Sequence, residues 1–237
     1  MKIAELLKDS LLELRKRPSY FVPKLSTSLI GSIWMLSVLF TLGDPLTVQQ
    51  DPTNLYLGLG TFPLIFFLGV LSPVIVAEMV KNDLGVIEAS KKCLSYTSRL
   101  IKASGYLIAI FIVTVLPFYF GLFLYFLAGS YFALATGTIV SAVLIIVLSY
   151  SIYFLPITLT DNSAPEGLRK SFNTSKNNST ETSILVIISF LLLIFAWASS
   201  GLLRGLGITG FILGRMISST MSTYTIIVSP KYYLEKE

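Results

Sequence analysis

The chain has 237 residues and a mass of 26.1 kDa, with 54% apolar and only 13% charged residues. Soluble domains carry about 25% charged residues, so this composition excludes a typical soluble globule. The mean hydropathy is +0.76 and the net charge is +5. Apolar runs of about 20 residues recur along the chain, which predicts an all-α polytopic membrane protein with one transmembrane domain over residues 1–237.

Residue counts also limit the chemistry that the chain offers. His is absent, so there is no imidazole base and no His metal ligand. The single Cys, Cys93, can form neither an intramolecular disulfide nor a thiolate cluster. Asp and Glu number 13 and lie almost entirely outside the apolar runs, which leaves little for acid–base or metal catalysis. We therefore expect no enzyme activity, no metal and no cofactor.

Six apolar segments are long enough to cross a hydrocarbon layer about 30 Å thick at 1.5 Å per residue. The second and fourth segments are long enough to tilt or kink, and Pro63, Pro73 and Pro156 provide places for this. The predicted spans are residues 25–42, 55–80, 104–128, 131–159, 183–203 and 208–228.

Positive charges are distributed unevenly among the connections. All but two of the 18 Lys and Arg residues fall before the first span, in the second-to-third and fourth-to-fifth connections, or after the sixth span. The exceptions are Arg204 and Arg215. The positive-inside rule then predicts a multi-pass protein of the cell membrane with both termini in the cytoplasm. This asymmetry explains the net charge, so the charge does not indicate nucleic-acid binding.

A short pattern recurs three times, each time ahead of a pair of spans. A Glu is followed by a basic residue three positions on, a small residue at five and an apolar residue at six. Residues three apart on a helix are surface neighbours, so each Glu is expected to form a weak ion pair with its base. The three pairs are Glu5 with Lys8, Glu88 with Lys91, and Glu166 with Arg169.

We interpret each copy as a short amphipathic helix on the cytoplasmic membrane face. Each helix and its two spans would form one unit, with units at residues 1–82, 83–161 and 162–237. Such repeats are parallel and would arrange the spans around a pseudo-threefold axis along the membrane normal. The alternative is that any Lys-rich helix ahead of a span produces a similar pattern.

Residues 162–178 read NSAPEGLRKSFNTSKNN and lead directly into an apolar span. This stretch resembles the E-A-L-K-R-S-W-x-L-x-K-x-N segment of uncharacterised prokaryotic six-helix membrane proteins, which are similar to the membrane domain attached to some glycerophosphoryl diester phosphodiesterases. Asn173 departs from the pattern, and no phosphodiesterase domain is present. The resemblance implies a six-helix architecture and little chemistry. Glu88-Ala-Ser also resembles the loop by which some importer permeases dock an ATPase, although Leu94 stands where that motif has Gly.

Arg215 lies about 10 Å into the sixth predicted span at 1.5 Å per residue. A central Arg costs about 2.5–3.5 kcal/mol on insertion scales, so a compensating interaction is expected. One interpretation is that Arg215, together with Arg204, holds an anion or a lipid headgroup near the outer leaflet; the other is that Arg215 snorkels outward or bonds backbone carbonyls. Ser218 and Ser222 belong to a hydroxyl-rich run in the same span, which either packs against another helix or lines a polar cavity.

Glu78 is the other charge close to an apolar segment, near the cytoplasmic end of the second span. Lys81 follows three residues later, so an i, i+3 ion pair at the membrane interface is expected. This interpretation makes Glu78 a surface residue with no further role.

The leading functional hypothesis is a non-enzymatic integral membrane protein that binds lipid or another amphiphile, or organises the membrane. Its partners would be the bilayer and anionic lipid. A transporter or channel subunit is one alternative, and a scaffold that recruits a cytoplasmic partner is another. Nothing in the sequence identifies a protein partner.

Overall fold

The computed structural model describes residues 3–42, 52–203 and 206–236, with the backbone alone at 35, 38–42, 52–59 and 62. The described residues form helices and turns, without a strand. Six long helices pair into three hairpins, as the lengths of the apolar runs predict. They are α2 (Phe21–Leu42) with α3 (Pro52–Asn82), α5 (Thr97–Ala128) with α6 (Tyr131–Ser151), and α9 (Ser179–Leu202) with α10 (Gly207–Lys236).

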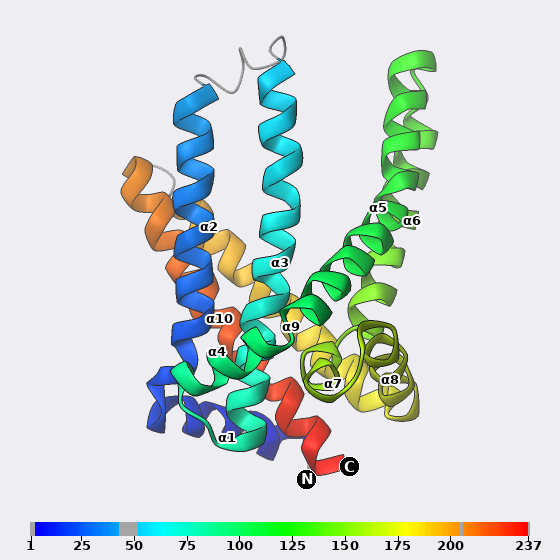
Figure 1. Ribbon diagram of the computed structural model, residues 1–237. Coiled ribbons are helices and arrows are strands. Elements are labelled where there is room, and N and C mark those ends of the chain that lie inside the picture. Colours follow the sequence, from blue (N-terminus) through cyan, green and yellow to red (C-terminus); the bar gives the residue numbers. More distant parts are fainter. Residues whose placement is uncertain (1–2, 43–51, 204–205, 237) are drawn as a thin grey trace.

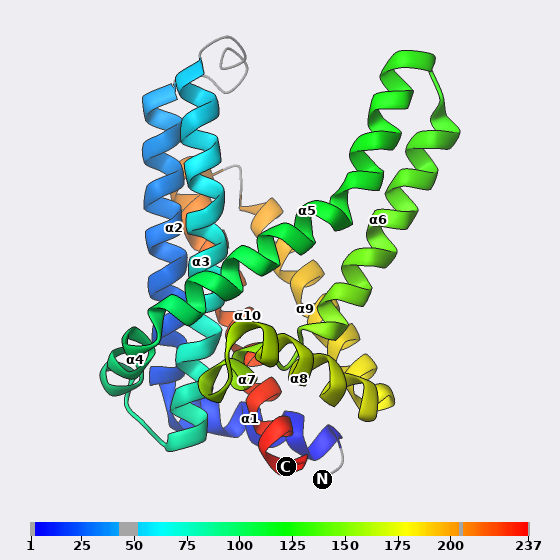
Figure 2. The ribbon, with the colours of Figure 1, turned by 45° about the vertical axis from the view of Figure 1, so that its right-hand side comes forward.

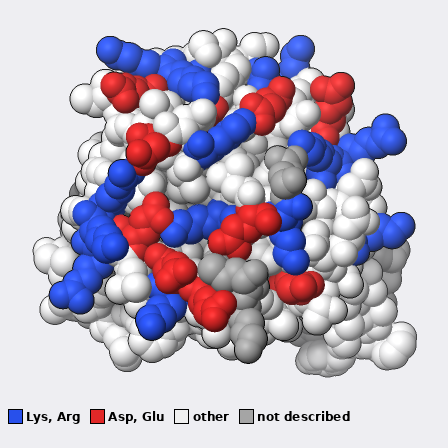
Figure 3. All heavy atoms as spheres, turned by 90° about the horizontal axis from the view of Figure 1, so that it is seen from below, with Lys and Arg blue, Asp and Glu red and all other residues white. Residues whose placement is uncertain are grey.

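Short helices gather at one end of the molecule together with both described ends of the chain (Figures 1 and 2). We call this the charged end, because Lys, Arg, Asp and Glu side chains are abundant on its surface (Figure 3). At the opposite end the α2–α3 and α5–α6 hairpins spread apart, so the molecule is V-shaped (Figure 2). The short helices are α1 (Ile3–Lys16), the 3₁₀ turn η1 (Pro18–Tyr20), α4 (Val86–Ser95), α7 (Leu155–Asp161) and α8 (Ala164–Asn177).

Five described helices are long and apolar enough to cross a membrane: α3 from Pro63 onward, α5, α6, α9 and α10. These five confirm a multi-pass helical membrane protein. Helix α2 covers the first predicted span, but part of its length is described by backbone alone, so its membrane crossing remains a prediction.

The fourth predicted span, residues 131–159, is wrong at its end. Helix α6 stops at Ser151, a turn follows, and a separate helix α7 begins at Leu155. Pro156 lies in the first turn of α7, where its missing N–H costs no helical hydrogen bond. The proline therefore separates two helices instead of kinking one. Helix α7 is largely buried at the charged end.

Three segments that contain or follow a proline form the core at the charged end. They are the end of α3 after Pro73, the whole of α7 around Pro156, and the end of α10 around Pro230, and they contact one another pairwise. Aromatic stacking between α10 and the turn before α7 closes this core. Its fully or nearly fully buried side chains include Val74, Val76, Met79, Phe154, Ile157, Leu159, Ile227 and Tyr232.

Polar contacts tie the surrounding helices to this core. Arg99 of α5 donates to the carbonyl oxygens of Leu159 and Thr160 at 3.0 and 3.1 Å, which satisfies the C-terminal end of α7. Ion pairs link neighbouring elements across the same surface: Arg17 with Asp83, Lys81 with Asp161, and Lys231 with Glu13.

The α5–α6 hairpin is held along its length by small residues. A Cβ atom on Gly137 would lie 2.3 Å from the carbonyl oxygen of Pro117, and one on Gly121 would lie 2.5 Å from that of Ala133. The backbone N–H of Phe118, next to the proline, donates to Ser141 Oγ at 2.9 Å. Close backbone approach replaces hydrophobic burial as the force between helices in lipid, so these glycines hold the hairpin together.

Substituting Gly137→Ala should destabilise the protein by about 1–3 kcal/mol, because the added methyl group overpacks a backbone contact. Thermal unfolding in detergent would report this as a lowered melting temperature. Gly105→Ala on α5 is the matched control, since its Cβ atom would meet nothing within 4 Å. Equal melting temperatures for the two variants would contradict the close packing.

Candidate functional site

The α9–α10 hairpin carries the predicted membrane site. Its helices approach closely at two glycines: a Cβ atom on Gly210 would lie 1.8 Å from the carbonyl oxygen of Leu203, and one on Gly214 would lie 3.0 Å from Ser200 Cβ. Ser200 Oγ donates to the Gly214 carbonyl at 3.0 Å. Gly207 starts α10 with φ of +60°, a conformation that favours glycine. These contacts fix the face of α10 that carries Arg215.

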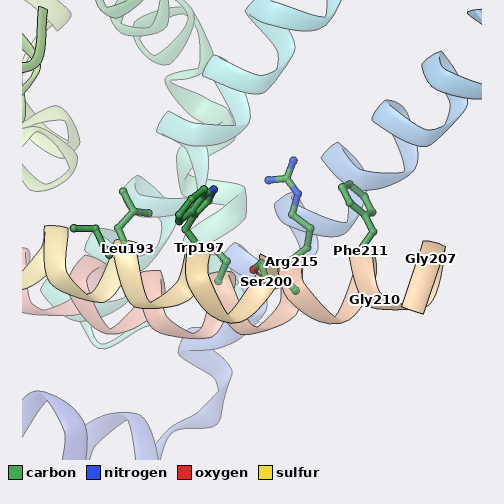
Figure 4. A pocket seen from close by; sticks show the side chains of 10 residues that line it. Leu193, Trp197, Ser200, Gly207, Gly210, Phe211 and Arg215 are labelled. Atoms are coloured by element: carbon green, nitrogen blue, oxygen red, sulfur yellow. Dashed lines mark hydrogen bonds between the residues drawn. The ribbon is translucent and has the colours of Figure 1, made fainter. Parts of the chain in front are cut away.

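A cavity of about 880 Å³ lies along this hairpin, and every described residue that lines it belongs to α9 or α10. Figure 4 shows Arg215, Trp197 and Leu193 pointing to the same side of the helix pair, with Phe211 beside Arg215. The Arg215 guanidinium carbon lies 5.5 Å from the centre of the Phe211 ring, a cation–π contact. Apart from Arg215, Ser200 and Ser218 the walls are apolar. Trp197 is 71% exposed, so we call this space the α9–α10 groove.

A second cavity of about 280 Å³ joins α2, α3, α9 and α10. It shares Leu193, Arg215 and Ser218 with the α9–α10 groove, so the two spaces adjoin at these residues. We call it the basic cavity, because Lys24 from the first turn of α2 lines it together with Arg215. Its remaining polar lining residues are Thr27, Ser28, Ser219 and Ser222.

The structure therefore places Arg215, Ser218 and Ser222 around one cavity, because positions three, four and seven apart share a helix face. The hydroxyl groups of Ser219, Ser222 and Thr223 each donate to a carbonyl of their own helix four residues back. Such hydroxyls keep lone pairs that can accept a further hydrogen bond. Arg204 lies outside the described residues. Lys24 was not predicted as a site residue, because a Lys ahead of a span is also explained by topology.

The tilt of the α9–α10 hairpin affects which residues lie near Arg215. The joined ends of α9 and α10 lie well below the tips of the other two hairpins (Figures 1 and 2). Arg215 lines the basic cavity together with Lys24 from the first turn of α2. The expected position of Arg215 in the outer half of the sixth span stays a prediction.

Each of the three predicted repeat motifs lies on a short helix: α1, α4 or α8. The expected ion pairs do not describe what the motifs do. Glu88 and Lys91 are exposed and form no ion pair with each other. Glu166 instead closes a capping box with Ser163, whose hydroxyl lies 2.6 Å from the carboxylate. This hydrogen bond lowers the pKa of Glu166. Glu5, Lys8 and Arg169 are likewise exposed.

The small residue at the fifth motif position is the informative one. Ser10, Cys93 and Ser171 occupy this position and are each fully buried. The apolar residue that follows is exposed in all three helices: Leu11, Leu94 and Phe172. Equivalent positions thus share the same burial, which supports the repeat as an interpretation without establishing it.

Glu78 is not the surface residue that the sequence predicted, and its expected pair with Lys81 is wrong. Its side chain is 0% exposed, and Lys81 pairs with Asp161 instead. Glu78 accepts hydrogen bonds from Asn82 Nδ2 and Tyr96 OH, both at 2.7 Å, and Lys92 Nζ lies 2.8 Å away. We call this set the Glu78 cluster; it attaches α4 to α3. Sequence reasoning missed it because Lys92 and Tyr96 are far from Glu78 in sequence.

Cys93 adjoins the Glu78 cluster, with its Sγ 3.3 Å from Tyr96 OH. Burial raises the pKa of the Cys93 thiol to about 11, and burial likewise raises the pKa of Tyr96. The thiol is therefore neutral throughout the physiological range. Among the described residues, no group of three His, Cys, Asp or Glu side chains converges as metal ligation would require.

Cys93 reports on the Glu78 cluster. In the folded protein at pH 8 it should resist iodoacetamide, since it is buried and its pKa of about 11 leaves almost no thiolate. Glu78→Gln removes the charge that holds Lys92, whose side chain is 45% exposed and can return to water. Labelling should then rise about tenfold, because losing a charge-assisted hydrogen bond makes local opening easier by about 1–3 kcal/mol.

Mass spectrometry of the labelled protein measures both rates. Glu88→Gln on the exposed face of α4 is the matched control and should leave Cys93 protected. Rapid labelling of the wild-type protein, or equal labelling of the two variants, would contradict this account of the Glu78 cluster.

No protein-family model, no curated protein and no solved structure matches this chain. The resemblance to the membrane domain attached to some phosphodiesterases therefore stays a hypothesis based on residues 162–178.

Proposed function

We propose that this protein is a non-enzymatic integral membrane protein that binds an anionic amphiphile in the α9–α10 groove. Arg215 would bind the anionic group of this ligand. The observation that carries the proposal is that Arg215 lines both the mostly apolar groove and the adjoining basic cavity. Ligand sites commonly combine mostly apolar walls with a few polar groups that fix orientation. A charged head beside an apolar tail matches that combination.

The energetics of Arg215 favour the same proposal. A central Arg in a membrane span costs about 2.5–3.5 kcal/mol on insertion scales, and such charges are functional candidates by default. Contact with the Phe211 ring offsets a part of this cost. An anionic headgroup would offset more, since charge-assisted hydrogen bonds strengthen where water is excluded.

The charged end would face the cytoplasm in the cell membrane. Both described ends of the chain and the short helices gather there, and basic residues are abundant on that surface (Figure 3). Anionic lipids of the cytoplasmic leaflet attract Lys and Arg by about 1 kcal/mol per residue near the surface. The exposed apolar residues Leu11, Leu94 and Phe172 would dip into the same interface.

Arg215→Ala should remove most of the bound amphiphile, weakening its retention at least about tenfold, since a hydrogen bond to a charged group contributes about 1.5–3 kcal/mol. Native mass spectrometry of protein released in a mild neutral detergent measures this directly. The exposed side chain of Arg215 predicts an unchanged melting temperature for the variant.

Arg169→Ala, an exposed change on α8, is the control and should leave the bound species in place. Equal occupancy of the wild-type and Arg215→Ala proteins would overturn the proposed function. So would the absence of any bound molecule in both.

A transporter is the second candidate, and one observation favours it. Further spaces lined by Ser189, Ser222 and Thr225 adjoin the basic cavity, and one of them reaches Ser149 and Tyr153 near the inner end of α6. Hydroxyl groups therefore line several neighbouring spaces along α10.

For this candidate, a Ser222→Trp variant should block flux of small anions from protein-containing liposomes by about tenfold or more, because the indole would fill the space beside Ser218. Efflux of an encapsulated anion-sensitive dye measures this. The control is Thr220→Trp on the exposed face of the same helix. Liposomes that stay tight with wild-type protein would exclude the transporter.

A further inference from the structure

Two cations from distant parts of the chain line the basic cavity. Lys24 lies in the first turn of α2, and Arg215 lies in the first third of α10. Repulsion between like charges is stronger in a protein interior than in water, because the effective dielectric constant is lower. A pair of cations held together in this way is stabilised by an anion placed between them.

The surroundings of the two cations fit an anion with several oxygen atoms. Hydroxyl groups from α2 and from α10 line the basic cavity, and Ser218 lies at its junction with the groove. Arg offers a planar fork that matches phosphate oxygens, and Lys adds a compact point charge with three donors. Among the described residues that line the basic cavity, none carries a carboxylate that would repel an anion. The hydroxyl residues are Thr27, Ser28, Ser218, Ser219 and Ser222.

The α9–α10 groove supplies the place for an apolar tail. It leaves the basic cavity at Leu193, Arg215 and Ser218 and continues along Ile194, Trp197 and Phe211. Figure 4 shows Leu193, Trp197 and Phe211 on one side of the helix pair. A ligand with its anionic group at Lys24 and Arg215 would therefore lay its tail along the groove.

We propose that the basic cavity selects a phosphate monoester headgroup, with the tail of the same amphiphile in the α9–α10 groove. This inference rests on the proposed function and names the class of its ligand. A phosphate monoester carries about 1.5–2 negative charges at pH 7, as a phosphorylated side chain does. Two cations that line one cavity match that charge. A phosphodiester headgroup carries one negative charge and would match the charge of only one of the two cations.

The test compares three lipids with identical acyl chains: phosphatidic acid, phosphatidylglycerol and phosphatidylcholine. Titration into the detergent-purified wild-type protein, followed by native mass spectrometry, should show phosphatidic acid binding at least about tenfold more tightly than phosphatidylglycerol. Phosphatidylcholine, with no net charge, should bind most weakly. Lys24→Gln should bring phosphatidic acid to within about twofold of phosphatidylglycerol, while Lys24→Arg should keep the preference.

Lys102→Gln is the matched control, because this exposed Lys of α5 lines neither space, and it should leave all three affinities unchanged. An unaltered preference in Lys24→Gln would overturn the proposed selectivity. If Arg215→Ala still lost both anionic lipids in that case, the proposed function would stand. Binding that depended on neither residue would overturn both proposals.

Inorganic phosphate provides the last arm of the experiment, because a free anion shares the chemistry of the headgroup. It should displace phosphatidic acid only at concentrations at least about a hundredfold higher, since each buried methylene of an acyl chain contributes about 0.8 kcal/mol. Displacement by inorganic phosphate at equal concentration would assign the basic cavity to a free anion and overturn the role of the groove.

Discussion

The junction of three proline-containing segments at the charged end is the constraint on which the rest of the structure depends. The ends of α3 and α10 and the whole of α7 bury their side chains against one another there. In lipid, apolar surface alone does not drive helices together, so hairpins that meet at one end are free to separate at the other. The V shape in Figure 2 follows from this one-sided core.

Polar interactions also stabilise this junction. Glu78 is buried at the edge of the core, where Tyr96, Asn82 and Lys92 satisfy its oxygen atoms. Removing one partner of such a group leaves the others unsatisfied, which makes the network a strong specifier of how α4 docks. An acidic residue follows each core proline by five positions, at Glu78, Asp161 and Glu235. This spacing is a second recurring feature of the chain, beside the motif on α1, α4 and α8.

The candidate site is a consequence of this arrangement. Since α10 enters the core with its C-terminal part, the tilt of the α9–α10 hairpin determines which residues its middle meets. The hairpin lies lower than the other two, and Arg215 lines one cavity with Lys24 of the first turn of α2. The groove along α9 and α10 adjoins this cavity. The positions of the proposed headgroup site and of the groove for the tail thus both depend on the tilt of the α9–α10 hairpin.

The sequence by itself determined the helical class, the approximate positions of the long helices and the three short helices, and it marked Arg215, Ser218 and Ser222 as candidate site residues. These features are local: apolar run length and a charge within a run are visible within a few turns of helix. Only the tertiary structure decided that Pro156 separates two helices, that Glu78 is buried with Lys92, and that Lys24 and Arg215 line one cavity. Each of these depends on tilt and on contacts between residues far apart in sequence, which helical periodicity does not encode.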